Sequence, residues 1–157
     1  MAFGDDAGFT AYLAANGYTL PAGAPAPAVL RQRGSAYING TYGPLFAGLP
    51  TGGFAQEDSW PRDGGEAYGQ TIGSDVTPVA VEHASYYAGY QEALRPGSLT
   101  VGTSTARSVK RKKIDVIETE FFEGSGNAVA DATVKFSVIE GLLAPFLCQP
   151  GIAVFVV

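Results

Sequence analysis

The spacing of apolar residues near the N-terminus predicts two helices. Asp6 can cap a first helix of about ten residues, whose apolar face would consist of Phe9, Tyr12 and Leu13. A second helix is expected at about 26–39, where Gly34 and Ser35 would let a partner helix approach closely. A short proline- and alanine-rich linker separates the two predicted helices.

The clearest helical pattern spans about 78–94. Pro78 suits the first position of a helix, because a proline there loses no backbone hydrogen bond. The residues expected to form its buried stripe are Val79, His83, Tyr86 and Tyr90. Between the second and third predicted helices, residues 40–73 read as a long glycine-rich loop, a feature that is usually functional or interfacial in a compact domain.

The C-terminal third changes from helical to extended patterning. Residues 105–121 alternate apolar and charged positions, which predicts one long strand or a β-hairpin. A short helix is expected at 138–146, and the apolar residues 152–157 favour an extended tail. The predicted fold is therefore α+β and mainly α. About three helices form a small core, accompanied by a long β arm or hairpin, a short C-terminal helix and an extended tail.

We expect one domain over residues 1–157. Within it, residues 1–97 would form the helical core with its long loop, 98–124 an extended basic arm, and 125–157 the C-terminal helix and tail. Charged residues make up only 16% of the chain, well below the roughly 25% of ordinary soluble domains. Such a surface is typical of a subunit that covers its faces with neighbours.

Charge is unevenly distributed. The chain carries a net charge of −5, which argues against a dedicated duplex-DNA binder. Half of its ten basic residues nevertheless fall in one short run, which consists of Arg107, Lys110, Arg111, Lys112 and Lys113. Three interpretations stay open: a solvated strand edge that blocks edge-to-edge pairing, a nonspecific grip on a nucleic-acid backbone, or a docking site for an acidic protein.

The sequence contains no pattern typical of a catalytic site. His83 is the only histidine, so no histidine triad or multi-histidine metal site can form within one chain. The single Cys148 excludes an intrachain disulfide, and Thr51-Gly-Gly lacks the lysine of a phosphate-binding loop. Carboxylate pairs such as Glu118 with Glu120 fit a solvated strand. We therefore expect a non-enzymatic protein without cofactor or metal.

The sequence also lacks the patterns that are typical of targeting signals. The N-terminus lacks the basic and apolar regions of a signal peptide, and the longest apolar run is too short to span a bilayer. These features predict synthesis in a cytosol and no membrane partner.

Two aromatic features are candidates for binding. Trp60, Pro61 and Arg62 lie within the glycine-rich loop, where the tryptophan could be an interface anchor or a core plug that ties the loop down; we favour the plug. Tyrosines at positions 86, 87 and 90 could stack on bases, although residues at helical spacing more often pack in a core or an interface.

The order of several short motifs resembles a tailed-phage family labelled DnaT-like single-stranded DNA-binding, whose members sit among head-tail genes. The resemblance covers about 9–146. The motifs that carry it are Leu30-Arg-Gln-Arg-Gly-Ser-Ala-Tyr-Ile-Asn-Gly40, Tyr42-Gly43, Gln56, Trp60-Pro61-Arg62, Asp75-x-x-Pro78, Ser108-Val109-Lys110-Arg111 and Gly141-Leu-Leu-Ala-Pro-Phe146.

This resemblance implies a structural virion protein, a head-tail connector (adaptor) located at the head-tail interface and acting without turnover. Its expected partners are the portal protein, further copies of itself in a twelve-fold ring, the next neck, stopper or tail-terminator protein, and passing DNA contacted nonspecifically. The alternative is a single-stranded DNA-binding protein of DnaT-like type. The residues expected at the portal or subunit interface are Arg107, Lys110, Arg111, Lys112, Lys113, Ile152, Val154, Phe155 and Val156.

Overall fold

The computed structural model describes residues 2–100, 111–114, 117–120 and 134–148, with side chains for 2–100 and 134–148. The chain divides into two compact units, residues 1–99 with 135–157 and residues 100–134. We call the described part of the first the helical unit and treat the two separately. The predicted fold class is confirmed: helices dominate, and the strands in the described residues are short and antiparallel.

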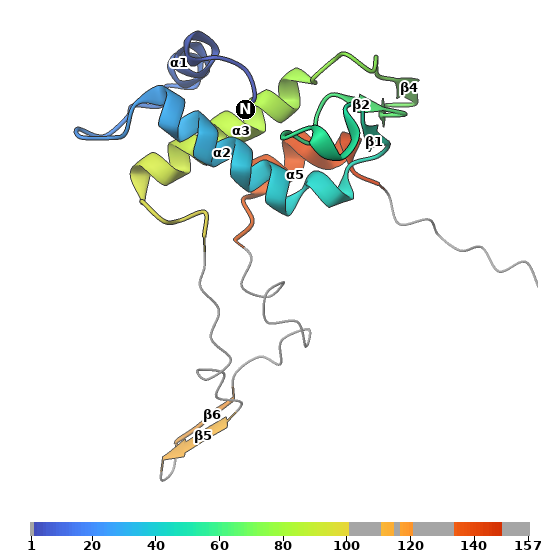
Figure 1. Ribbon diagram of the computed structural model, residues 1–157. Coiled ribbons are helices and arrows are strands. Elements are labelled where there is room, and N and C mark those ends of the chain that lie inside the picture. Colours follow the sequence, from blue (N-terminus) through green and yellow to red (C-terminus); the bar gives the residue numbers. More distant parts are fainter. Residues whose placement is uncertain (1, 101–110, 115–116, 121–133, 149–157) are drawn as a thin grey trace, which may run out of the picture. The chain divides into compact units, whose positions relative to one another are not determined.

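Four α-helices build the helical unit (Figure 1). They are α1 (Asp6–Ala15), α2 (Pro27–Thr41), α3 (Val79–Leu94) and α5 (Ser137–Leu143), the last continued by the 3-10 turn η4 (Ala144–Phe146). The first helix begins one residue earlier than predicted. The carboxylate that caps it belongs to Asp5, whose Oδ1 accepts from the Gly8 amide at 2.6 Å, and Asp6 occupies the first turn.

Small residues let α2 and α3 cross at close range, as the sequence predicted for α2. A Cβ atom at Gly34 would collide with the Ser85 carbonyl oxygen, and one at Gly89 would lie 2.6 Å from the Leu30 carbonyl oxygen. The face of α3 that meets α2 therefore carries small side chains such as Ser85 and Gly89. The predicted stripe is wrong in part: Val79 is 62% exposed, because α3 turns its small face, and not its first valine, toward α2.

The glycine-rich segment between α2 and α3 has more structure than a long loop. It contains the 3-10 turns η1 (Gly43–Leu45) and η2 (Gly53–Ala55) and four two-residue strands, β1 (Leu49–Pro50), β2 (Arg62–Asp63), β3 (Glu66–Ala67) and β4 (Gln70–Thr71). Strands β1 and β2 pair antiparallel, as do β3 and β4. An antiparallel bridge between Phe46 and Leu147 joins this segment to the residues that follow α5.

The core contains two groups of buried side chains. The larger comprises Phe3, Tyr37, Ile38, Tyr42, Phe46, Trp60, Val81, Ala84, Ala88, Ile139, Leu143 and Phe146. The smaller lies where α1 meets α2 and α3, and comprises Phe9, Tyr12, Leu13, Leu30, Tyr86 and Ala93. Within the described residues, no helix combines the length and apolar character that crossing a bilayer would require.

In the second unit, strands β5 (Arg111–Ile114) and β6 (Ile117–Glu120) form an antiparallel pair (Figure 1). Both lie in the segment 105–121 that was predicted to be a strand or a hairpin. The division into regions of a single domain stays a prediction.

Candidate functional site

A group of four tyrosines, the buried Tyr12 and three half-buried ones, lies where α1, the α1–α2 linker and α3 meet. We call Tyr12, Tyr18, Tyr87 and Tyr90 the tyrosine strip. The Tyr18 and Tyr90 rings stack almost in parallel, with centroids 4.6 Å apart and planes 7° apart. The Tyr87 ring lies 6.0 Å from that of Tyr18, and the ring of Tyr12 lies 4.8 Å from that of His83. Three of the four, Tyr18, Tyr87 and Tyr90, are half-buried.

The hydroxyl groups distinguish this strip from Tyr42 and Tyr86. Tyr42 is fully buried and donates to Glu140 Oε1 at 2.6 Å, and the Tyr86 hydroxyl accepts from the Asp5 amide at 3.1 Å. Within the described residues, by contrast, no hydrogen bond engages the hydroxyls of the tyrosine strip. Burial raises the pKa of Tyr12 to about 12, with further contributions from Tyr18 and Tyr87, so the phenol of Tyr12 stays protonated near neutral pH.

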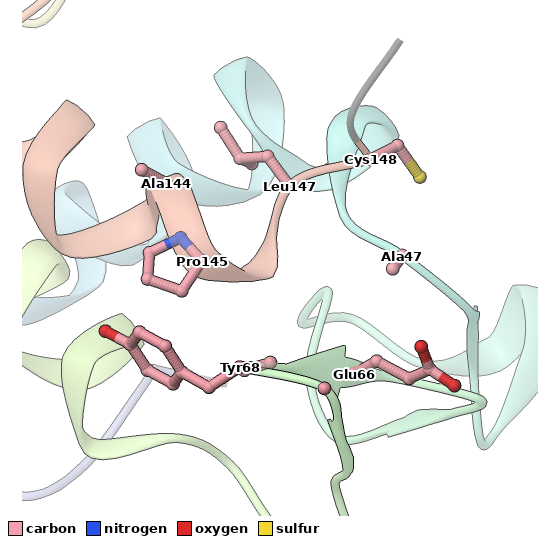
Figure 2. A pocket seen from close by; sticks show the side chains of 9 residues that line it. Ala47, Glu66, Tyr68, Ala144, Pro145, Leu147 and Cys148 are labelled. Atoms are coloured by element: carbon pink, nitrogen blue, oxygen red, sulfur yellow. The ribbon is translucent and has the colours of Figure 1, made fainter. Parts of the chain in front are cut away.

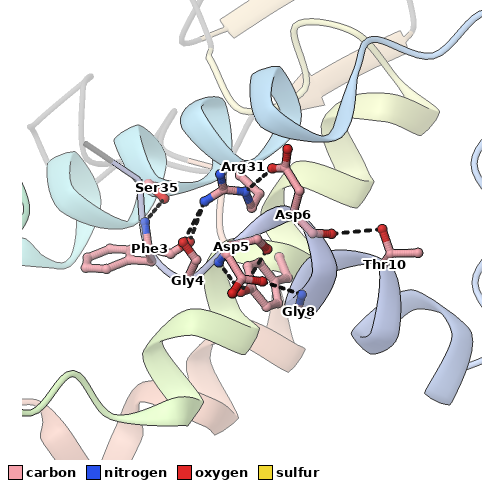
Figure 3. A network of polar contacts seen from close by, with 9 residues as sticks. Phe3, Gly4, Asp5, Asp6, Gly8, Thr10, Arg31 and Ser35 are labelled. Atoms are coloured by element: carbon pink, nitrogen blue, oxygen red, sulfur yellow. Dashed lines mark hydrogen bonds and ion pairs between the residues drawn. The ribbon is translucent and has the colours of Figure 1, made fainter.

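A polar network at the N-terminus holds α1 against α2 and so positions the strip (Figure 3). Arg31 Nε donates to Asp6 Oδ1 at 2.6 Å, and its Nη1 donates to the carbonyl oxygens of Phe3 and Gly4. The Phe3 amide donates to the buried Ser35 Oγ at 2.9 Å. Because the planar guanidinium of Arg31 donates hydrogen bonds to three acceptors, the start of α1 is held in one orientation relative to α2.

Trp60 and Arg62 occupy the base of the glycine-rich segment. Trp60 is 2% exposed, and its indole ring meets Phe46 and Phe146 edge-on, with centroids 5.7 and 6.1 Å apart. Arg62 is also buried and donates to the carbonyls of Phe46, Ala47, Gly48 and Ser59. Burial lowers the pKa of its guanidinium from a very high ordinary value. The Trp60–Pro61 peptide bond is cis.

The predicted basic run lies only partly in the described residues. Arg107 and Lys110 lie outside them, while Arg111, Lys112 and Lys113 are in β5. The register of the hairpin places Arg111 opposite Glu120, Lys112 opposite Thr119 and Lys113 opposite Glu118. Since directly opposite residues share one face of an antiparallel pair, two of the three basic positions have an acidic neighbour across the strand.

The remaining predicted interface residues, Ile152, Val154, Phe155 and Val156, lie outside the described residues. Of the tyrosines predicted as possible base-stacking residues, Tyr86 is 2% exposed and belongs to the core, whereas Tyr87 and Tyr90 lie in the strip. Sequence reasoning missed Tyr18. Its position just after the helix-ending Asn16-Gly17 was a usable signal, because a residue leaving a helix C-terminus often packs back on that helix.

A second surface feature is a groove of about 580 Å³ between the β3–β4 hairpin and the segment after α5 (Figure 2). Its lining includes Tyr68, Pro145 and Leu147, with Glu66 as its acidic residue. Tyr68 is 85% exposed and has a φ of 53°, which is unusual for a bulky residue. In the part of the chain with described side chains, no cluster of histidine, cysteine or acidic residues could hold a metal ion.

Comparison with known proteins identifies one family. The family model described as "Putative DnaT-like ssDNA binding protein" matches residues 2–157, almost the whole chain. Searches of curated proteins and of solved structures find no match. The family match contradicts the predicted head-tail connector role and agrees with the alternative, a DnaT-like single-stranded DNA-binding protein. The connector interpretation rested on the head-tail genes among which family members sit, and on the low charge, glycine-rich loops, apolar tail and lack of catalytic residues, none of which specifies what a surface binds. The portal, ring and neck partners, the virion location and the absence of enzyme activity stay predictions.

Proposed function

We propose that this chain, which belongs to the family of DnaT-like ssDNA binding proteins, binds single-stranded DNA without reading its sequence. The family match over residues 2–157 carries the proposal. It extends across both compact units, so neither can be set aside as an unrelated addition.

The chemistry of the described residues supports this function. Proteins that bind single strands combine aromatic side chains, on which bases stack, with basic residues that track the phosphate backbone. The helical unit supplies partly exposed tyrosine rings, and β5 supplies three consecutive basic residues. Both kinds of contact tolerate any base sequence, because every base has a π-face and every nucleotide has a phosphate.

Charge sets an upper limit on how strongly the protein can hold DNA. The net charge is −5, and the five basic residues of the run are its only concentrated positive charge. If each neutralised one phosphate, affinity for a single strand would fall with a log–log salt slope of about −3.5, or about 100-fold between 50 and 200 mM salt. If the carboxylates across β5 weaken two of those contacts, the loss would be closer to 20-fold.

A fluorescence-anisotropy titration of the full-length protein against a labelled oligo-dT strand tests the proposal. Mixed-sequence single strands and a duplex of equal length serve as comparisons. We expect similar affinity for the two single strands, weaker binding to the duplex, and a salt slope between about −2 and −3.5. Absence of single-strand binding at 50 mM salt, or equal affinity for duplex and single strand, would contradict the proposed function.

A further inference from the structure

We infer that the tyrosine strip is the surface on which the bases of single-stranded DNA stack, with its phenol hydroxyls donating to the DNA. This inference rests on the proposed function and assigns it to named residues. It follows from the surroundings of the eight tyrosines, which fall into classes with different contacts.

Core tyrosines satisfy their hydroxyls inside the protein, as Tyr42 does with Glu140 and Tyr86 with the Asp5 backbone. A tyrosine kept only for packing is expected to do the same or to be replaceable by phenylalanine, since a buried hydroxyl needs a partner. Within the described residues, the four hydroxyls of the strip donate to no protein acceptor. These hydroxyls can therefore donate to acceptors of a bound DNA strand, such as phosphate oxygens and base carbonyls.

The rings themselves are arranged as a stacking surface. Tyr87 and Tyr90 lie three residues apart on α3, about one helical turn, and Tyr18 stacks on Tyr90 from the α1–α2 linker. The parallel Tyr18–Tyr90 pair has the geometry that a base would extend by stacking on an outer face. His83, one turn before Tyr87, continues the aromatic surface toward Tyr12.

The strip is also held in place before any ligand arrives. Tyr12 comes from α1, whose start is fixed by the contacts of Arg31 with Asp6, Phe3 and Gly4 (Figure 3). Tyr87 packs against Phe136, which leads into α5, with ring centroids 6.2 Å apart. Rings that are already ordered lose little conformational entropy on binding, so more of the stacking energy contributes to affinity.

Stacking and phosphate contacts differ in their response to salt, which makes the inference testable separately from the proposed function. Removing a ring from the strip should weaken binding by a factor that is the same at 50 and 200 mM salt. Removing a basic residue should weaken binding less as salt rises, since counterion release is lost. A protein partner on the strip would leave DNA affinity unchanged when rings are removed.

The experiment compares Tyr18→Leu, Tyr87→Leu and Tyr90→Leu with the matched control Tyr68→Leu, which removes an exposed tyrosine far from the strip in sequence and outside its ring contacts. We expect each strip variant to lose about 5- to 100-fold in oligo-dT affinity with an unchanged salt slope, and the control to bind like wild type. The phenylalanine variants at the same positions keep the ring, so they should lose less. Thermal unfolding checks that each variant is folded.

Photo-crosslinking of the wild-type protein to a strand containing 5-iododeoxyuridine keeps the inference testable even if a leucine variant does not fold. Peptide mapping should place crosslinks on Tyr18, Tyr87 or Tyr90. Crosslinks confined to other residues, or strip variants that bind like wild type, would overturn the inference and leave the proposed function standing. If the strip variants lose self-association in sedimentation while keeping DNA affinity, the strip is a protein-docking surface and the inference is wrong. Absence of binding by the wild-type protein would overturn both.

Discussion

The two compact units differ in charge and in aromatic content. Residues 100–134 contain five of the ten basic and five of the fifteen acidic residues, so they are neutral overall, and the helical unit and tail carry the whole net charge of −5. The helical unit holds all eight tyrosines, whereas β5 and β6 contain no aromatic residue. The tyrosines and the concentrated basic residues thus belong to different units, and the proposed function needs both.

Consecutive basic residues in a sequence do not by themselves form a basic surface. Antiparallel pairing sets Glu118 and Glu120 across from Lys113 and Arg111, so the phosphate backbone of DNA would have to compete with these carboxylates. The helical unit buries two groups of apolar side chains, and β5 and β6 have four residues each.

The largest expected effect is a loss of stability of the helical unit. Trp60→Ala should lower the free energy of unfolding by about 3–5 kcal/mol, because it leaves a cavity against Phe46 and Phe146. Denaturant titration measures the change. Phe54→Ala is the matched control, since Phe54 is fully exposed and its removal should cost little. If Trp60→Ala were as stable as the control, the indole would not anchor the glycine-rich segment.

The next effect tests the basic strand. Replacing Arg111, Lys112 and Lys113 by glutamine should reduce oligo-dT affinity about 10- to 100-fold at 50 mM salt and flatten the salt slope by up to about 2. Anisotropy titrations over a range of salt measure both quantities. Arg95→Gln, an exposed cation of the helical unit, is expected to change the slope by less than about 0.7. An unaltered slope in the triple variant would exclude these residues from phosphate contact.

A smaller effect tests the cross-strand pairing. Glu118→Gln with Glu120→Gln should raise oligo-dT affinity about two- to five-fold, since the carboxylates no longer compete with phosphates for Arg111 and Lys113. Glu66→Gln with Asp75→Asn changes the net charge equally within the helical unit and should raise affinity less. Equal gains in the two double variants would point to net charge alone and contradict a role for the register.

The smallest effect concerns the turn between β3 and β4. Tyr68 and Gly69 both have positive φ, the geometry of a two-residue hairpin turn in which asparagine is favoured at the first position. Tyr68→Asn should therefore raise the free energy of unfolding by about 0.5–1 kcal/mol, and Tyr68→Val should lower it. Denaturant titration of the two variants measures the difference. Loss of stability in the asparagine variant would mean that packing of the ring beside Pro145 outweighs its backbone strain.

Much of the fold could be predicted from local sequence. The period of apolar residues located α1, α2, α3 and α5 to within a few residues, and alternation located the β5–β6 segment, since both signals arise from backbone periods of 3.6 and 2. The two-residue strands between α2 and α3 were not predicted, because strands that short leave no period in the sequence. Their positions depend instead on Arg62, whose guanidinium donates to the backbone carbonyls of Phe46 and Ala47 in an earlier part of the loop.

The sequence by itself determined which segments are helical, the mainly α fold class and the uneven placement of charge. Only the tertiary structure decided which face of each element is buried and which is free. On α3, close approach of α2 at Gly34 admits only small residues such as Ser85 and Gly89, which leaves Tyr87 and Tyr90 at the margin of the core. On β5, the register with β6 decided which basic positions pair with acidic ones. The first outcome depends on backbones that meet across a long sequence separation, and the second on the position of a turn; local periodicity specifies neither.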